Sequence, residues 1–247
     1  MSLHKFGPKS VQTFLIFTTF LLIQIGFSHS QENVNFSKIE TEFELSENQS
    51  FEYRKITKGY QLSNSKSTCR IAVDLGKGKS YGTGTLIAKN EKLALVITAH
   101  HLISGNPNPK SIICDFQKGA YPATIVGRDE SNDLLALLIY SNSDMVATSI
   151  SQSYSKSNKL SSFQHPNGNP QQLYQEGGDQ GYSRKGDIIL NFYSEPGASG
   201  SGIFQQDQLV AVLWGSNLGN RTSIATPLSK IQSFLDTQII PKYDWVA

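Results

Sequence analysis

The sequence predicts an all-β fold, because short apolar or alternating runs recur at close spacing from Cys69 onward. Gly, Asn, Pro and Ser separate these runs, as they separate the strands of sandwiches and barrels. Only residues 228–235 have helical spacing, with apolar side chains at Leu228, Ile231, Phe234 and Leu235. We therefore expect about twelve strands in a sandwich or a pair of barrels, followed by one short C-terminal helix.

The expected strands form two groups on either side of a connector at residues 141–159, which is rich in Ser and Asn. The first group comprises residues 69–75, 81–88, 93–98, 111–116, 123–126 and 134–140. The second group comprises residues 160–164, 172–175, 187–192, 202–204, 208–213 and 223–225. This division predicts one domain at residues 68–240, with barrel one at about 68–145 and barrel two at about 158–240.

Residues 1–30 have the pattern of a secretory signal peptide. Lys5 and Lys9 precede an apolar stretch, and the small residues Ser28 and Ser30 follow it at the spacing of a cleavage site. The alternative is a membrane anchor, but two glutamines interrupt the stretch and leave an apolar core too short to span a bilayer. We expect cleavage after Ser30 and a secreted or periplasmic protein.

Residues 31–67 are polar and irregular, and their first part is acidic, so they are predicted to be an N-terminal extension or pro-segment. The alternative is that part of this segment adds a strand to the domain. Cleavage after Ser30 would remove two of the 22 basic residues and none of the 20 acidic ones, leaving 20 of each. A formally neutral chain gives no indication of a nucleic-acid partner or of stable membrane association after signal cleavage.

The two cysteines, Cys69 and Cys114, lack the spacing of a metal site. In an exported protein they would form one disulfide or remain as two free thiols, and the sequence leaves both states open.

A candidate nucleophile lies in residues 195–202, which read Glu-Pro-Gly-Ala-Ser-Gly-Ser-Gly between two apolar runs. A serine flanked by glycines can be held in a tight turn, where the N–H groups of Gly197 and Ser199 converge as an oxyanion hole. Short Gly/Ser turns are also common as plain connections. The catalytic interpretation therefore depends on a base and a carboxylate elsewhere in the chain.

Both groups have candidates upstream. An apolar strand ends in His100 and His101, whose side chains point to opposite faces of an extended segment and so do not suit one metal ion. Asp133 precedes a strongly apolar strand. Alone, each has a structural alternative: a buried histidine for His101, and a turn residue for Asp133. The order His101, Asp133, Ser199 is the chymotrypsin order, whereas α/β-hydrolases run Ser, Asp, His.

These segments resemble the trypsin-like (chymotrypsin-fold) peptidases, particularly the glutamyl-endopeptidase and HtrA-like branches. Residues 82–87 (Gly-Thr-Gly-Thr-Leu-Ile), 97–101 (Ile-Thr-Ala-His-His) and 133–137 (Asp-Leu-Leu-Ala-Leu) are similar to motifs of that family. Residues 164–168 (Gln-His-Pro-Asn-Gly), 195–204 and 213–216 (Leu-Trp-Gly-Ser) resemble three more. The resemblance implies two six-stranded antiparallel β-barrels of chymotrypsin type with a short C-terminal helix. His165 is expected to be a structural turn residue.

The resemblance also implies roles for individual residues. His101 would be the base, Asp133 its carboxylate and Ser199 the nucleophile. The substrate pocket would be lined by Tyr193, Ser194, Leu213, Trp214 and Gly215.

Three departures from the family pattern bear on these roles. Ala198 replaces the aspartate with which trypsin-type enzymes bind their new N-terminus, so the site is expected to form without that switch. Tyr193 stands at a position that is acidic in trypsin, so cleavage after Lys or Arg has no support. No histidine lies near Leu213, which weakens a preference for glutamate.

The sequence thus predicts a secreted serine endopeptidase that hydrolyses peptide bonds through an acyl-enzyme, without cofactor or metal. The partner would be a peptide or protein substrate. Three alternatives remain: a catalytically silent binding module on the same fold, an esterase with the same triad, and a protease whose extension blocks the cleft until it is removed.

Overall fold

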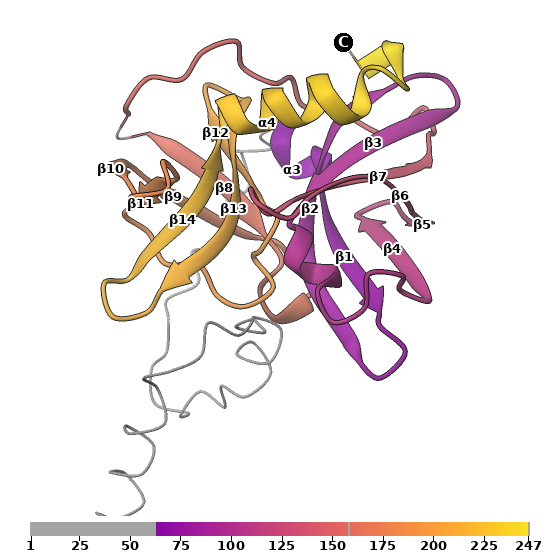
Figure 1. Cartoon of the computed structure of the whole chain (residues 1–247), viewed down its shortest axis with the longest axis horizontal. Helices are drawn as coiled ribbons and strands as arrows, with labels where there is room; N and C mark the ends of the chain where they lie inside the picture. The colour runs from indigo at the N-terminus through magenta and orange to yellow at the C-terminus, as the bar shows by residue number, and fades with distance from the viewer. Residues whose placement is uncertain (1–62, 158, 247) are drawn as a thin grey trace, which may run out of the picture. The chain divides into compact units, whose positions relative to one another are not determined.

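The described part of the chain consists mainly of two curled antiparallel sheets. The structure is a computed structural model, and it describes residues 63–157 and 159–246. The predicted signal peptide and most of the predicted extension lie outside these residues. Figure 1 shows the first sheet, indigo to magenta, beside the second, orange to yellow. The two sheets are half-barrels of the chymotrypsin-like fold, which confirms the predicted fold class.

The first sheet has the strand order β5-β4-β1-β2-β3-β7-β6. Its strands are β1 (Thr68–Asp74), β2 (Lys79–Lys89), β3 (Leu93–Thr98), β4 (Ser111–Phe116), β5 (Gly119–Pro122), β6 (Thr124–Asp129) and β7 (Leu134–Tyr140). A short 3-10 turn, η1 (His100–Ile103), follows β3 almost directly.

The second sheet has the order β10-β11-β14-β13-β12-β8-β9. Its strands are β8 (Leu160–Gln164), β9 (Leu173–Gly177), β10 (Asp179–Tyr182), β11 (Ile188–Leu190), β12 (Gly202–Gln205), β13 (Gln208–Asn217) and β14 (Thr222–Pro227). A 3-10 turn, η2 (Pro166–Gly168), lies between β8 and β9.

Each sheet has seven strands rather than the six that we expected. The two additional strands are β5 and β10, which lie at sheet edges and are four residues long. Both contain glycine, and β5 also contains a proline, so neither has the β-branched or apolar alternation that marks a strand in the sequence. Edge strands tolerate such residues because one side of their backbone needs no partner strand.

The C-terminal helical segment packs where the two sheets meet. It consists of α4 (Leu228–Phe234) and a π turn, η3 (Leu235–Ile239), and a last 3-10 turn, η4 (Asp244–Val246), follows. Ile231 and Phe234 share one buried cluster with Leu95 of β3 and Phe204 of β12. This cluster contains residues of both sheets, beside a separate cluster within each sheet. Figure 1 shows the segment crossing the upper end of the sheets.

A short helix, α3 (Ser63–Ser67), precedes β1 and belongs to the segment that we predicted as an extension. Its Asn64 is buried, and the Asn64 side chain bonds to Thr148 and Asp207. The last residues of the predicted extension therefore pack against the domain.

Cys69 on β1 and Cys114 on β4 are both buried, and both are free thiols. Burial and a hydrogen bond with Cys114 raise the pKa of Cys69 well above its ordinary value. A raised pKa keeps this thiol protonated and makes it a poor nucleophile. The two cysteines thus contribute to the core of the first sheet without a covalent link.

Candidate active site

His101 and Asp133 are held together by two hydrogen bonds. His101 lies in η1, just beyond the end of β3, and Asp133 lies in the turn between β6 and β7. The His101 backbone N–H donates to Asp133 Oδ1 at 2.7 Å. The ring Nδ1 lies 2.7 Å from Asp133 Oδ2. An ionised carboxylate accepts from both groups, so Nδ1 carries the hydrogen and Nε2 of the neutral ring is the basic nitrogen.

The turn that carries Asp133 is held by its own neighbours and by the second sheet. Asp133 has a left-handed backbone, with φ 54°. The Asp129 carboxylate accepts hydrogen bonds from Ser131 Oγ and from both the N–H and the side chain of Asn132. Burial raises the pKa of Asp129, but these bonds outweigh it, and the net pKa is lowered. Thr226 Oγ1 of β14 donates to the Asn132 carbonyl at 2.7 Å.

The nucleophile candidate follows a type II turn. The Ala198 N–H donates to the Glu195 carbonyl at 3.0 Å, which closes a four-residue turn with Pro196 and Gly197 at its centre. Gly197 has φ +88°, and a type II turn requires such a positive value at its third residue. Proline at the second position and glycine at the third are the residues that this turn favours.

The first sheet and the middle of β13 then fix the backbone at Ser199 and Gly200. The Thr83 N–H donates to the Ser199 carbonyl at 2.8 Å, and the Gly200 N–H donates to the Leu213 carbonyl at 2.7 Å. Gly200 has φ +88°, and a Cβ there would lie 2.1 Å from Thr98 Oγ1 and 2.9 Å from the backbone nitrogen of Ala99. Only glycine allows this approach, which places the Ser199 turn against the segment that leads into His101.

The two expected oxyanion-hole donors belong to this turn. Ser199 is 6% exposed, so its surroundings exclude most water. Within residues 63–157 and 159–246, the Gly197 N–H meets no acceptor. A backbone donor without a protein acceptor beside a buried serine is what an oxyanion hole needs before substrate arrives.

The predicted substrate-pocket residues lie on two segments beside this turn. Ser194 is buried, and its hydroxyl lies 3.0 Å from both Gln164 Nε2 and Ser223 Oγ. Leu213 is buried in the core of the second sheet. The β13–β14 register shifts between Leu213 and Gly215, so Trp214 lies at a bulge, and a Cβ on Gly215 would meet nothing within 4 Å.

Tyr193 lies in the segment before the Ser199 turn, and it lines a cavity together with Glu195 and Arg221. Burial and the Glu195 charge raise the pKa of Tyr193, while Ser216 and Arg221 oppose that shift. Tyr193 is therefore a neutral phenol at neutral pH, a polar but uncharged group among the predicted pocket residues.

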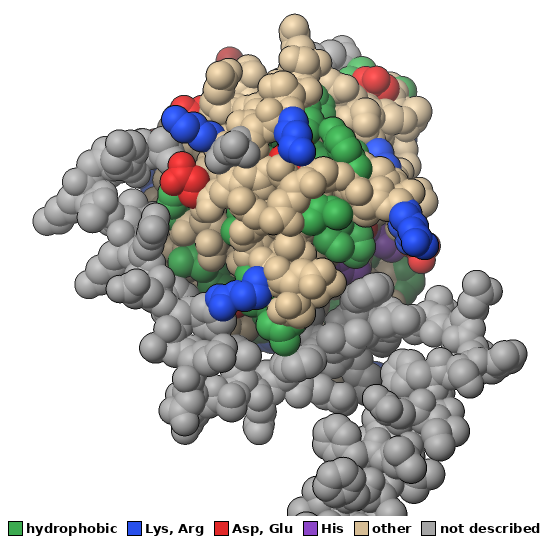
Figure 2. All heavy atoms as spheres, turned by 90° about the vertical axis from the view of Figure 1, so that its left-hand side faces the viewer, with side chains coloured by type: hydrophobic (Ala, Val, Ile, Leu, Met, Phe, Trp, Pro, Cys, Tyr) green, Lys and Arg blue, Asp and Glu red, His purple; other side chains and the backbone are tan. Residues whose placement is uncertain are grey.

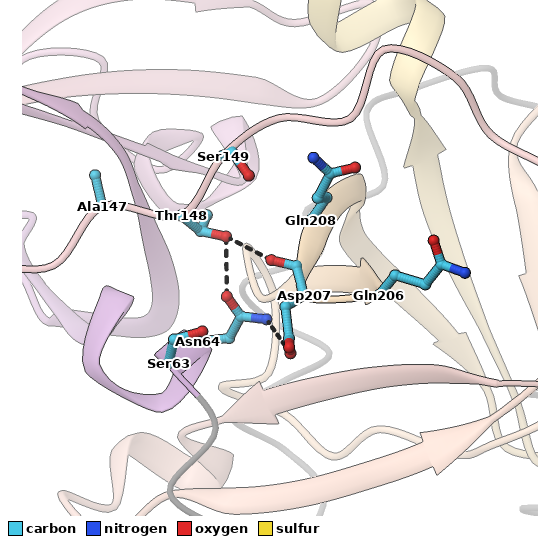
Figure 3. Close-up of a pocket in the computed structure, with 8 residues that line it drawn as sticks. All are labelled: Ser63, Asn64, Ala147, Thr148, Ser149, Gln206, Asp207 and Gln208. Atoms are coloured by element: carbon cyan, nitrogen blue, oxygen red, sulfur yellow. Dashed lines mark hydrogen bonds between the residues drawn. The ribbon is translucent and has the colours of Figure 1, made fainter.

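Two cavities lie outside the triad. One, of about 480 Å³, has Tyr193, Glu195, Asn220 and Arg221 among its lining residues. The other, of about 550 Å³, lies where α3 meets the β12–β13 hairpin. Figure 3 shows its polar lining, in which Asn64, Thr148 and Asp207 bond to one another. These hydrogen bonds connect α3 to the β12–β13 hairpin, and they indicate a structural role for this region.

Charged patches, metal sites and membrane spans are the other features of the described residues that bear on function. On the face in Figure 2, Lys and Arg side chains lie apart from one another, and some of them are beside acidic side chains. Among the described residues, no group of three or more His, Cys, Asp or Glu side chains could hold a metal ion. The same residues include no helix that is long and apolar enough to cross a membrane.

Sequence reasoning missed several residues that build the site. Thr83 and Asn132 make hydrogen bonds to partners more than ninety residues away, and Asn167 bonds to the turn at Glu195 and Pro196. No local pattern marks such pairs. Thr83 lies within the Gly-Thr-Gly segment, whose glycines pack against Ser199 and Val96. The glycines of this segment were therefore a sequence signal for close packing near the site. His165 is a buried turn residue at the start of η2, with Nδ1 2.8 Å from the Asn169 carbonyl oxygen.

The sequence and the fold were compared with known proteins. The profile of the family described as trypsin-like peptidase domain matches residues 82–212. A serine endoprotease from Yersinia pestis has a TM-score of 0.62 at 16% identity, over 74% of this chain and 67% of that one. The Rv3671c protease from M. tuberculosis, in its active form, has a TM-score of 0.61 at 15% identity, over 72% and 82%. No curated protein matches the sequence significantly.

Proposed function

Because this chain belongs to the family of trypsin-like peptidase domains, we propose that it is a serine endopeptidase that works through His101, Asp133 and Ser199. The observation that carries the proposal is the double hydrogen bond between His101 and Asp133, at 2.7 Å for each contact. One bond holds the backbone of the base and the other holds its ring, so the tautomer and the orientation of the imidazole are both defined.

The proposed reaction begins with attack of Ser199 Oγ on a peptide carbonyl. His101 Nε2 takes the hydroxyl proton, and Asp133 stabilises the imidazolium that forms. The N–H groups of Gly197 and Ser199 bind the oxyanion of the tetrahedral intermediate, each donor being worth about 10²–10³ in rate. His101 then protonates the leaving amine, and water releases the acyl group by the same steps.

The substrate would bind as an extended peptide. Strand β12 pairs with β13 only from Gln208 to Val212, so residues 214–217 of β13 would offer their other edge to an added strand. Tyr193 and Ser194 would give the primary pocket a polar but uncharged wall. The signal-like N-terminus adds the proposal that the enzyme acts outside the cytoplasm, as a secreted or periplasmic protein.

The direct test is the Ser199→Ala variant. Turnover of fluorescently labelled casein is expected to fall about 10⁴–10⁶-fold, because the nucleophile and its acyl-enzyme are lost. Ser233→Ala, an exposed serine on α4, is the matched control and keeps full activity. Full hydrolysis by folded Ser199→Ala would refute the assignment.

Two rival functions use the same fold. A silent binding module would hydrolyse neither casein nor p-nitrophenyl acetate although the protein is folded. An esterase would cleave the ester and leave casein intact. Comparing the two substrates on one preparation separates both rivals from a peptidase.

A further inference from the structure

The orientation of one peptide group decides whether the proposed oxyanion hole exists. In a trans peptide the C=O and the N–H point in opposite directions. In the type II turn at Glu195, the central peptide joins Pro196 to Gly197, and it is reversed relative to a type I turn. A type I turn would therefore replace the Gly197 donor with the Pro196 carbonyl. Something must hold the type II form when no substrate is bound.

The η2 segment holds that peptide. The Asn167 N–H donates to the Pro196 carbonyl at 2.6 Å, so the opposite Gly197 N–H points away from η2. A Cβ on Gly197 would lie 2.7 Å from both the Asn167 nitrogen and the His165 carbonyl oxygen. The next peptide is fixed as well, because Thr83 Oγ1 donates to the Gly197 carbonyl at 2.9 Å.

Asn167 makes this contact only because of its unusual backbone. Its φ of 53° and ψ of 25° are left-handed, a conformation that asparagine tolerates better than most residues. Its side-chain Nδ2 also donates to Glu195 Oε2 at 3.2 Å, at the first residue of the turn. The residue thus contacts the turn through both its backbone and its side chain.

The first sheet supports η2 from behind. Arg70 Nη1 donates to the Gly168 carbonyl at 3.1 Å, and Arg70 Nη2 pairs with Asp115 at 2.7 Å. The His165 N–H donates to Thr83 Oγ1 at 2.9 Å. Thr83 therefore links η2 to the Gly197 carbonyl. The η2 segment is held by the first sheet at both of its ends, through Thr83 at His165 and through Arg70 at Gly168.

We propose that Asn167 is a positioning residue for the oxyanion hole, which holds the Pro196–Gly197 peptide in its donor orientation. The inference rests on the proposed function. Asn167 has no contact with the reacting atoms in this role. Its effect belongs to the transition state, where the oxyanion forms, and leaves substrate binding nearly unchanged.

The test is a series at position 167, assayed with p-nitrophenyl acetate. Asn167→Gly keeps the left-handed backbone and the N–H, so kcat is expected within about threefold of the wild type. Asn167→Val disfavours that backbone, since a β-branched residue at positive φ is strained. For Asn167→Val we expect kcat to fall about 10²-fold, the scale of one lost oxyanion donor, with KM unchanged.

Gln206→Val is the matched control, because Gln206 also has a positive φ, 51°, but lies in the β12–β13 hairpin. It is expected to lose similar thermal stability while kcat stays unchanged. Should Asn167→Val fail to fold, Asn167→Ala carries a smaller strain and is expected to lie between Gly and Val in kcat. Equal kcat for the position-167 variants and Gln206→Val, or a loss confined to KM, would overturn the inference.

Ser199→Ala in the same assay separates a failure of the proposed function from a failure of the proposed role of Asn167. If Ser199→Ala remains fully active, the proposed function fails whatever position 167 does. If Ser199→Ala is inactive and Asn167→Val is fully active, only the role of Asn167 fails.

Discussion

Asp133 shows how one residue sets the geometry of the site. Its left-handed backbone, φ 54°, lets the carboxylate reach both the N–H and the ring of His101. Such a conformation costs free energy in a residue other than glycine, and aspartate is among the residues that bear it best. The sequence predicted the pairing of His101 with Asp133 through the family motif. It did not predict this backbone, which depends on bonds to Asn132 from a distant strand.

The first prediction concerns Asp133→Asn. The amide keeps the size and the backbone tolerance of the aspartate, but its NH₂ group favours the wrong tautomer of His101. Casein turnover is expected to fall about 10⁴-fold while the melting temperature changes little. A loss of less than tenfold in a folded variant would contradict the role of Asp133.

The second prediction concerns the buried His165. Burial lowers its pKa, the Asn169 carbonyl opposes that shift, and the Arg70 charge lowers the pKa further against the opposite effect of Asp115. The folded pKa is thus below the unfolded value of 6.5. Below pH 6.5 the unfolded chain binds more protons than the folded one, so stability is complete above that pH and is lost as the pH falls through the folded pKa.

The measurement is the urea midpoint at pH 7.5 and at pH 5. The wild type is expected to lose more stability between the two values than His165→Asn, whose amide can still donate to the Asn169 carbonyl. An identical pH dependence in the two proteins would show that His165 does not carry the effect.

At the scale of elements, the structure confirms the expected strands that have apolar alternation or continuous apolar runs. Buried strands such as β3 and β7 are almost entirely apolar, and the sequence located both at their observed bounds. The edge strands β5 and β10 lacked that signal because they are short and no apolar residue in them is buried. Helix α3 had no signal either, since its polar residues are ordered by contacts with distant segments.

The third prediction tests the hydrogen bonds that hold α3 against the domain. Asn64 is 1% exposed, and its side chain bonds to Asp207 and Thr148. Asn64→Ala removes one partner of the buried Thr148 hydroxyl and the bond to the exposed Asp207, so it is expected to lower the free energy of unfolding by about 1–3 kcal/mol. Ser63→Ala, an exposed residue of the same cavity, is the control. A loss of casein turnover in folded Asn64→Ala would show that these hydrogen bonds also support the active site.

At the scale of the whole molecule, the proposed site lies where the two sheets meet. The first sheet supplies His101 and Asp133, and the second supplies Ser199 and the pocket segments. Thr83 and Thr226 each bond across to the other half. The motif order singled out the three residues of the proposed triad, because each lies in a short local pattern. The sequence did not predict the hydrogen bonds of Thr83 and Thr226 between the two halves, because a single threonine in a strand has the same local pattern whether or not it has a distant partner.

Ala198 bears on how the whole molecule holds the turn at Ser199 in place. It is fully buried in the core of the second sheet, where trypsin-type enzymes have an aspartate that pairs with a new N-terminus. We therefore propose that packing and the η2 contacts, rather than a buried ion pair, keep the turn at Glu195–Ser199 in place. This proposal predicts an active protein whose N-terminus need not be newly cut within the domain.

The most direct test of the catalytic proposal is labelling with a fluorophosphonate probe, followed by mass spectrometry of the digested protein. A serine activated by His101 and faced by an oxyanion hole displaces fluoride and keeps the phosphonyl group. The expected result is one adduct per chain, located on Ser199, and none in Ser199→Ala or in protein unfolded by urea. An unlabelled but folded wild type, or an adduct on another serine, would contradict the assignment of Ser199 as the nucleophile.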